Sequence, residues 1–146
     1  MRGLRRASLD SGLGRAREAL EATGIEASVH SAEPLPAGVE TLLGFAVREG
    51  VTNVVRHSGA GRCEIAVRRT SEVAELEVCD DGDGAANGAG DGSGLRGLSE
   101  RMTEAGGTLE AGPVESGGFR LLARVPIAAY THSRPGEEAE PVASGR

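Results

Sequence analysis

The chain has 146 residues, of which 38% are hydrophobic and 26% charged, and its formal net charge is −6 at pH 7. This length fits one globular domain with its own core, and the acidic balance argues against a nucleic-acid-binding protein, which normally carries a basic patch. No stretch approaches the roughly 18 consecutive apolar residues of a membrane span, and there is no signal-peptide core. We therefore expect a cytoplasmic domain that contacts neither membrane nor nucleic acid.

The basic and sulfur-containing side chains argue against two further kinds of site, a P-loop and a cysteine metal centre. All 16 basic residues are arginines, and a P-loop is excluded because that motif needs a lysine at the phosphates. Cys63 and Cys79 lack the spacing of metal ligands. We expect both cysteines to be reduced, buried and packed as small hydrophobic residues.

The first half of the chain predicts two helices separated by a strand. Apolar residues recur at helical spacing over 9–20, with Ser8 as a possible N-cap and Gly24 as the stop. Residues 25–30 alternate as a strand does. From 37 to 57 the pattern predicts an amphipathic helix with one broad buried stripe. The stripe comprises Val39, Leu42, Leu43, Ala46, Val47, Val51, Val54 and Val55.

The second half predicts a sheet and one more helix. The strands are expected at 63–70, 73–80, 108–112 and 119–126. Residues 95–105 fit a helix that ends at a pair of glycines. After residue 127 the tail is rich in small, polar and charged residues, and we expect it to be disordered. The whole pattern predicts an α+β fold, a two-layer sandwich of a mixed, mostly antiparallel sheet with helices on one face.

The stretch CDDGDGAANGAGDGSGLRG, residues 79–97, matches several glycine-rich signatures loosely. GSGLRG satisfies a dinucleotide fingerprint, but the preceding strand ends near residue 80, too far upstream for the tight turn that this motif needs. A calcium loop starting at Asp81 would need an acid or amide, a glycine and a glutamate where Ala85, Ala86 and Gly92 stand. A plain linker is the simplest remaining interpretation.

A second, polar stripe lies on the long predicted helix. Glu49, Asn53 and Arg56 fall at i, i+4 and i+7 away from the buried stripe, and His57 lies at its edge. Side chains aligned in this way could hold a metal-bound polyphosphate, since an amide oxygen is a hard ligand for Mg²⁺. Taken alone, these residues are more simply a solvated helix face.

Three segments in order resemble the motifs of one family. REGVTNVVRHSGA (48–60) resembles the N-box, DDGDG (80–84) the first glycine box and GSGLRGLSERM (92–102) the second glycine box of sensor histidine kinases. These kinases belong to the Bergerat-fold, or GHKL, ATPase superfamily. The likeness is greatest to the short-lid kinases of the nitrate-sensor and cold-sensor type, and it covers roughly residues 9–127.

The resemblance implies a site for the base of ATP at the first glycine box. Asp80 takes the place of the aspartate whose carboxylate accepts a hydrogen bond from the adenine amino group. Gly82 would let the backbone approach the base, and Gly84 would start the lid. Phe119 and Arg120 stand where many relatives have a threonine that binds adenine through water, so the resemblance does not extend to that contact.

The N-box similarly implies residues for the metal and the phosphates. Asn53 corresponds to the Mg²⁺ ligand, and Glu49 to the residue that positions water or acts as a base. Arg56 and His57 match a pair that contacts the phosphates in related kinases. The cofactors implied are thus ATP and Mg²⁺.

The resemblance to the second glycine box implies further residues of the same site, which would close the lid and contact the phosphates. Gly92 and Gly94 would close the lid, and the N–H groups of the helix opening at Leu95 would meet the phosphates. Arg96 is a further candidate for a phosphate contact.

The histidine that receives the phosphoryl group in this family has no counterpart in the chain. His30, His57 and His132 are each followed by serine rather than by the usual acidic residue. The resemblance therefore implies a catalytic domain that transfers the γ-phosphoryl group of ATP to a histidine on a separate dimerisation domain, with a response regulator downstream.

The expected organisation follows from this assignment. Residues 1–8 would be the end of the linker from the missing dimerisation domain, 9–127 the ATPase domain and 128–146 the tail. We expect the isolated domain to be a monomer. Two alternatives remain, an anti-sigma-factor serine kinase of the same superfamily and a nucleotide-binding module without catalysis.

Overall fold

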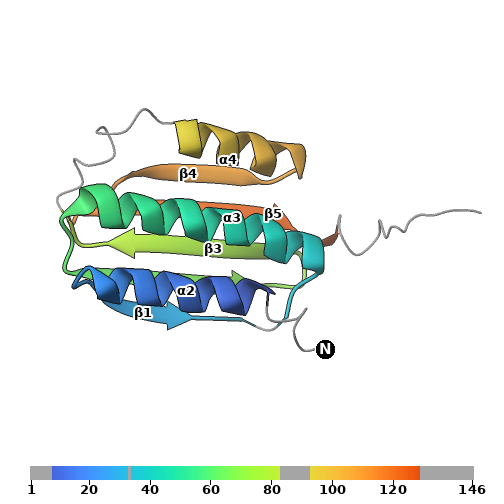
Figure 1. Ribbon diagram of the computed structural model, residues 1–146. Helices are drawn as coiled ribbons and strands as arrows, with labels where there is room; N and C mark the ends of the chain where they lie inside the picture. Colours follow the sequence, from blue (N-terminus) through green and yellow to red (C-terminus); the bar gives the residue numbers. More distant parts are fainter. Residues whose placement is uncertain (1–7, 33, 83–92, 129–146) are drawn as a thin grey trace, which may run out of the picture.

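The computed structural model describes residues 8–32, 34–82 and 93–128, and within them three α-helices lie on one face of a five-stranded sheet (Figure 1). The helices are α2 (Ser8–Ala22), α3 (Ala37–Asn53) and α4 (Ser93–Glu104). The strands are β1 (Glu26–His30), β2 (Arg62–Arg69), β3 (Val73–Asp80), β4 (Thr108–Pro113) and β5 (Phe119–Pro126). The predicted two-layer α+β fold is confirmed, and each predicted strand lies within a residue or two of its expected place.

The sheet has the order β1-β2-β3-β5-β4, with β1 parallel to β2 and the other neighbours antiparallel. The mixed sheet arises because α2 precedes β1 and α3 carries the chain from β1 to β2, whereas a tight turn joins β2 to β3. In that turn Thr70 Oγ1 accepts hydrogen bonds from the backbone N–H groups of Glu72 and Val73, both at 3.1 Å. The turn closes the end of the hairpin opposite to the tip of β3.

The core lies between the sheet and the helices. Along β3 burial alternates strictly, so that Ala74, Leu76, Val78 and Asp80 face the helices. The apolar stripes predicted on the first two helices supply the opposite layer, including Leu20, Leu43 and Val47. Asp80 is the exception in this pattern, because it occupies an inward position at the strand end with a carboxylate.

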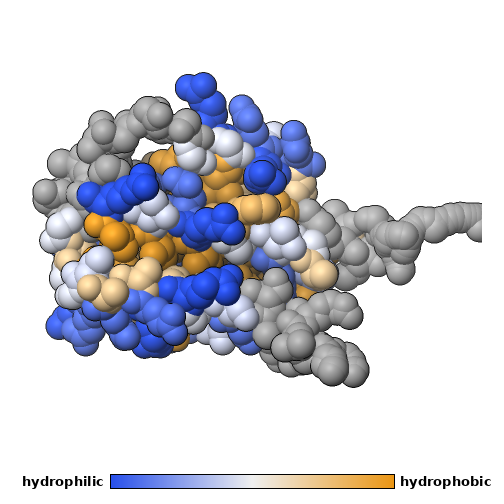
Figure 2. Space-filling view, viewed as in Figure 1, coloured by the Kyte–Doolittle hydropathy of each residue, from blue (hydrophilic) through white to orange (hydrophobic). Residues whose placement is uncertain are grey.

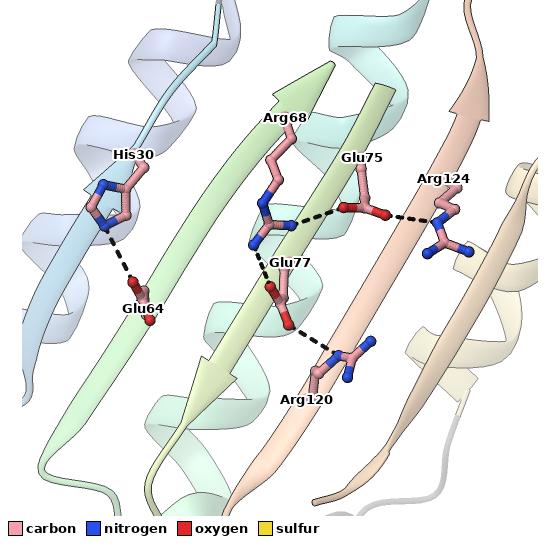
Figure 3. Close-up of polar contacts among 7 residues, drawn as sticks. All are labelled: His30, Glu64, Arg68, Glu75, Glu77, Arg120 and Arg124. Carbon is pink, nitrogen blue, oxygen red and sulfur yellow. Dashed lines mark hydrogen bonds and ion pairs between the residues drawn. The ribbon is translucent and has the colours of Figure 1, made fainter. Parts of the chain in front are cut away.

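Charged strand residues on the other face of the sheet pair across strands (Figure 3). Arg68 donates to Glu75 at 2.8 Å and to Glu77 at 2.7 Å. Arg124 then pairs with Glu75 at 2.7 Å and Arg120 with Glu77 at 3.0 Å. These five residues form a network that we call the ion-pair ladder, and it lets this face of the sheet remain in water.

The long helix differs from its prediction at the C-terminal end. The sequence predicts one regular helix over 37–57, but α3 ends at Asn53 and a π-helical turn, η1 (Val54–Ser58), follows before Gly59 at φ +64°. A π turn is wider than an α turn, so Arg56 does not continue the straight stripe of Glu49 and Asn53. Such turns occur frequently at functional sites.

Glu40 is a buried acid that the sequence pattern did not reveal. It lies in the first turn of α3 with 8% of its surface exposed. Its carboxylate accepts hydrogen bonds from the backbone N–H groups of Leu9 at 3.4 Å and Leu35 at 3.3 Å. These bonds join the start of α2, the loop before α3 and α3 itself, which explains why an acid is tolerated there.

The two cysteines differ from each other. Cys63 is buried as expected, whereas Cys79 is only half-buried because it lies on the same face of β3 as the ion-pair ladder. The prediction that both are buried is therefore wrong for Cys79. No helix in the described ranges is long and apolar enough to cross a membrane.

Candidate functional site

The tip of β3 carries a carboxylate in an unusual position. Asp80 is 5% exposed, and its Oδ1 accepts a hydrogen bond from the backbone N–H of Gly82 at 2.7 Å. A buried carboxylate is costly unless hydrogen bonds compensate for the lost water. A protein that places one at an inward strand end therefore has a specific use for it, in structure or in binding.

Helix α3 places its polar residues over this tip. A Cβ added to Gly50 would stand 3.1 Å from Cγ2 of Val78, so α3 approaches β3 closely two residues before Asp80. In Figure 1 α3 and β3 run in the same direction. Because three helical residues rise about 4.5 Å and two strand residues about 6.6 Å, Asn53 comes within roughly 2 Å of the level of Asp80 along the strand. Asn53 and Glu49 are both half-buried.

The start of α4 completes this end of the molecule. Figure 1 shows the C-terminal end of α3, the tip of β3 and the beginning of α4 at the same end of the sheet. A Cβ built on Gly94 would overlap the carboxylate of Glu49, so that carboxylate rests against the first turn of α4 and would have to shift if residue 94 were larger. The N-terminal turn of a helix favours an anion, which accounts for the position of Glu49.

The remaining predicted site residues fall into three groups. Arg56 and Arg96 are exposed, and Leu95 is half-buried at the opening of α4. Gly84 and Gly92 lie outside the described residues, and for His57 the structure describes the backbone within η1 but not the side chain. The described residues contain no group of three or more His, Cys, Asp or Glu side chains that could hold a metal by themselves.

The electrostatic environment at the strand tip is acidic. Burial, together with the nearby carboxylates of Asp80, Asp81 and Glu64, raises the pKa of the Cys63 thiol to about 12. Cys63 lies opposite Asp80 in the β2–β3 pair. An anionic ligand would therefore need its charge met by arginine, by backbone N–H groups or by a cation.

Two glycines in the chain make a close approach to this tip possible, and sequence reasoning missed one of them. Gly118 has a φ of +95°, and a Cβ added there would overlap the backbone oxygen of Asp80. The Gly-Gly pair directly before a strand, at 117–118, is the sequence signal that could have revealed it. Gly118 thus packs against Asp80 from the β5 side, while Gly94 lies on the α4 side.

A groove elsewhere on the helical layer contains none of the predicted site residues. It has a volume of about 380 Å³, lies between α2 and α3, and is lined by small residues such as Gly12, Ala16 and Gly44 beside the half-buried Phe45. Figure 2 shows apolar surface exposed among charged residues on this side of the molecule. Arg101 of α4 stacks 4.2 Å from the centre of the Phe45 ring. The groove also has polar residues in its lining, among them Arg15, Arg48 and Thr52.

The curated proteins that are similar to this chain in sequence are sensor histidine kinases. No protein-family model matches the chain. The chain is 33% identical over 115 residues to the sensor histidine kinase DesK of Bacillus subtilis, a match that covers 75% of this chain and 30% of DesK. It is 37% identical over 109 residues to the sensor histidine kinase NarS of Mycobacterium tuberculosis, covering 67% of this chain and 26% of NarS. The chain thus spans under a third of the length of these relatives.

Solved structures show the same architecture. The histidine kinase domain of a blue-light activated kinase from Erythrobacter litoralis superposes with a TM-score of 0.68 at 19% identity, covering 86% of this chain and 66% of that one. Full-length ShkA in complex with AMPPNP superposes with a TM-score of 0.67 at 21% identity, covering 84% of this chain and 30% of that one. The fold is that of histidine kinase catalytic domains, and the chain belongs to the sensor histidine kinase family.

Proposed function

We propose that this chain binds Mg²⁺-ATP at the end of the sheet formed by the tip of β3, the end of α3 and the start of α4, and transfers the γ-phosphoryl group to a histidine on another domain. The observation that carries the proposal is the buried carboxylate of Asp80 at the tip of β3, the end of the strand toward which α3 carries the half-buried Asn53 and Glu49 (Figure 1). The relatives support it because they are sensor histidine kinases.

The base of ATP would bind at Asp80. Its carboxylate accepts a hydrogen bond from the Gly82 N–H, and the two oxygens of a carboxylate together can accept several hydrogen bonds. The adenine amino group is a donor, whereas guanine presents an acceptor at the corresponding position. Asp80 therefore favours adenine, and the Gly82 backbone beside it would lie against the base.

The phosphates would bind at the first turn of α4. Its free N–H groups form an anion site in a helix of 12 residues, and the Glu49 carboxylate now rests there. Arg56 and Arg96 are exposed cations on the two flanking helices, and they would neutralise phosphate charge along with His57. Gly84, Gly92, Gly94 and Leu95 would line the covering segment and its junction with α4.

The donor set at the end of α3 fits Mg²⁺. The Asn53 amide oxygen and the Glu49 carboxylate are hard oxygen donors one helical turn apart, and Mg²⁺ is commonly held by few protein ligands with phosphates and water completing its shell. Bound there, the ion would neutralise charge that develops on the phosphates during transfer. Asn53 would hold the ion, and Glu49 would orient water or take a proton.

The acceptor would come from outside the chain. His30 lies at the end of β1, where it pairs with Glu64 at 3.2 Å on the face of the sheet away from the helices. His57 belongs to the phosphate side of the proposed site. The partner is then the dimerisation domain of the parent kinase, with a response regulator downstream, and the domain acts in the cytoplasm as a monomer when isolated.

Labelling with ATP radioactive at the γ-phosphate tests this function. The chain alone should bind ATP yet acquire no acid-labile phosphohistidine, and adding the separately expressed dimerisation domain should restore labelling on that partner. Labelling should be slow, because the tethered acceptor's high effective concentration is lost. Stable self-labelling of the chain would contradict the proposal, and an acid-stable phosphoserine on a supplied protein would favour the anti-sigma-factor kinase.

A further inference from the structure

Asp81, the residue after Asp80, joins two parts of the chain that are distant in sequence. Its Oδ1 accepts hydrogen bonds from the backbone N–H groups of Gly61 and Arg62, each at 2.9 Å. Its own N–H donates to the Arg62 carbonyl at 3.2 Å. Three hydrogen bonds therefore fasten the end of β3 to the beginning of β2.

The fastened loop is also held on its other side. The carbonyl of Gly61 accepts a hydrogen bond from the N–H of Glu26 at 2.8 Å, so the loop is tied to β1 as well as to Asp81. The hydrogen bonds that the carboxylate of Asp81 accepts from these two N–H groups lower its pKa below the ordinary range. The bond from the N–H of Arg62 has the larger effect. The carboxylate is thus ionised, and its oxygen is used as an acceptor, throughout the physiological range.

The position of this link relates it to the candidate site. Gly61 and Arg62 follow η1 and Gly59, which lead directly from Asn53. Asp81 stands between Asp80 and Gly82, whose own hydrogen bond shapes the strand tip. One side chain therefore connects the segment proposed to read adenine with the segment proposed to hold metal and phosphate.

We propose that Asp81 is a positioning residue for nucleotide binding, which fixes the tip of β3 against the chain leaving α3 so that Asp80 and Asn53 face one ligand. Its part is indirect, because the Oδ1 bonds to Gly61 and Arg62 hold the backbone on both sides of the site in place. The role rests on the proposed function of the site. It also requires a short side chain with an acceptor oxygen, a requirement that asparagine meets and alanine does not.

A pair of substitutions separates this role from general stability. Asp81→Asn keeps an oxygen that can accept from both N–H groups, whereas Asp81→Ala removes it. Thr70→Ala is the matched control, because Thr70 Oγ1 also accepts from two backbone N–H groups, at the opposite end of the same hairpin. The two alanine variants should lose similar thermal stability.

Calorimetric titration with Mg²⁺-ATP and with adenosine, well below the melting temperature of each variant, provides the test. Asp81→Ala should weaken the binding of both ligands by about 3- to 10-fold, the factor that one lost hydrogen bond typically costs. Asp81→Asn and Thr70→Ala should bind within about 2-fold of wild type. The amide resonances of Gly61 and Arg62 should shift in Asp81→Ala and stay near their wild-type positions in Asp81→Asn.

Each outcome bears on a distinct claim. Tight ATP binding by wild type with equal affinity in Asp81→Ala would overturn the positioning role and leave the proposed function intact. Weakened binding in both Asp81→Ala and Thr70→Ala would also overturn it, because hairpin stability would then explain the loss. Failure of the folded wild-type chain to bind ATP would refute the proposed function and the positioning role together.

Discussion

Two regions of the same sheet use carboxylates in opposite ways. On the face away from the helices, Glu75 and Glu77 meet arginines directly at 2.7–3.0 Å, and their charges are balanced within the protein. At the tip of β3, Asp80 accepts a hydrogen bond from the backbone N–H of Gly82, Asp81 accepts two from Gly61 and Arg62, and Glu49 rests on the first turn of α4. A backbone N–H orients a carboxylate without contributing a full opposite charge, which suits a site that must bind a ligand.

The largest expected effect comes from the glycine that packs against the tip. Gly118→Ala adds a Cβ that overlaps the Asp80 oxygen, whereas Gly117→Ala, at a similar φ of +100°, has nothing within 4 Å. Both variants carry backbone strain, so their difference isolates the contact with Asp80. The free energy of unfolding of Gly118→Ala should be about 1–3 kcal/mol lower than that of Gly117→Ala, because overpacking typically costs this much. Urea denaturation measures this, and equal values would show that Gly118 does not support the tip.

The acidity of the tip predicts a dependence of stability on pH. Burial and neighbouring carboxylates hold the pKa of Cys63 at about 12 in the folded protein against 9.0 for an ordinary thiol. The folded thiol therefore keeps a proton that the unfolded chain releases, so the contribution of Cys63 is complete below pH 9.0 and is lost as pH rises toward about 12. The loss approaches 1.4 kcal/mol for each pH unit in that window, about the value of one unit of pKa.

Reducing urea denaturation at pH 8 and pH 10 checks this dependence, with Cys63→Ala as the reference. The wild type should lose more stability than the variant between the two conditions. A parallel decline in both proteins would mean that the thiol is not held protonated.

Replacing Asn53, the proposed metal ligand, should distinguish binding of the metal ion from binding of the adenine base. Asn53→Ala should weaken ATP binding in the presence of Mg²⁺ by about 10-fold, or 1.4 kcal/mol, because ligand-shell changes have effects of that order. Adenosine binding should stay near the wild-type value, since Asn53 would contact the ion and not the base. Calorimetry with Mg²⁺ and with EDTA distinguishes the cases, and equal losses in both would assign Asn53 to the fold.

The ion-pair ladder should give the smallest effect. Glu75→Gln should lower the free energy of unfolding by less than about 1 kcal/mol, because partly exposed ion pairs contribute little. The hydrogen bond from Arg124, followed by that from Arg68, lowers the pKa of Glu75 from 4.5. Its contribution is therefore present above pH 4.5 and is lost as pH falls through the lowered pKa. Glu72→Gln removes the same charge from an exposed residue outside the ladder, and urea denaturation of both variants at neutral pH should show the larger loss of stability for Glu75→Gln.

Local patterns predicted most of the fold but not the contacts between distant segments. Alternation in β3 and the apolar stripe of α3 depend on residues close in sequence, and both were predicted correctly. The π turn after Asn53, the burial of Glu40 and the link from Asp81 to Gly61 depend on tertiary packing, which periodicity does not contain. The ion-pair ladder likewise depends on strand register, because Arg68 faces Glu75 only when β2 and β3 pair as they do.

The candidate site follows the same division. The motifs predicted a set of nucleotide-binding residues, and within that set the structure brings Glu49 to Gly94 and packs α3 against β3 at Gly50, one turn before Asn53. They did not predict Gly118 or Asp81, whose roles come from backbone atoms that they approach. Glycines and short acids of this kind leave little signal in a single sequence.

The most direct test of the account is calorimetric titration of the chain with Mg²⁺-ATP and Mg²⁺-GTP, comparing wild type with Asp80→Asn and with Glu75→Gln. Both substitutions replace a carboxylate with an amide on β3, one at the tip and one in the ladder. We predict that wild type prefers ATP to GTP, that Asp80→Asn weakens ATP binding by about 10- to 150-fold through loss of a charge-assisted hydrogen bond, and that Glu75→Gln leaves it unchanged. Unaltered ATP affinity in Asp80→Asn, or equal affinity of wild type for the two nucleotides, would contradict the account.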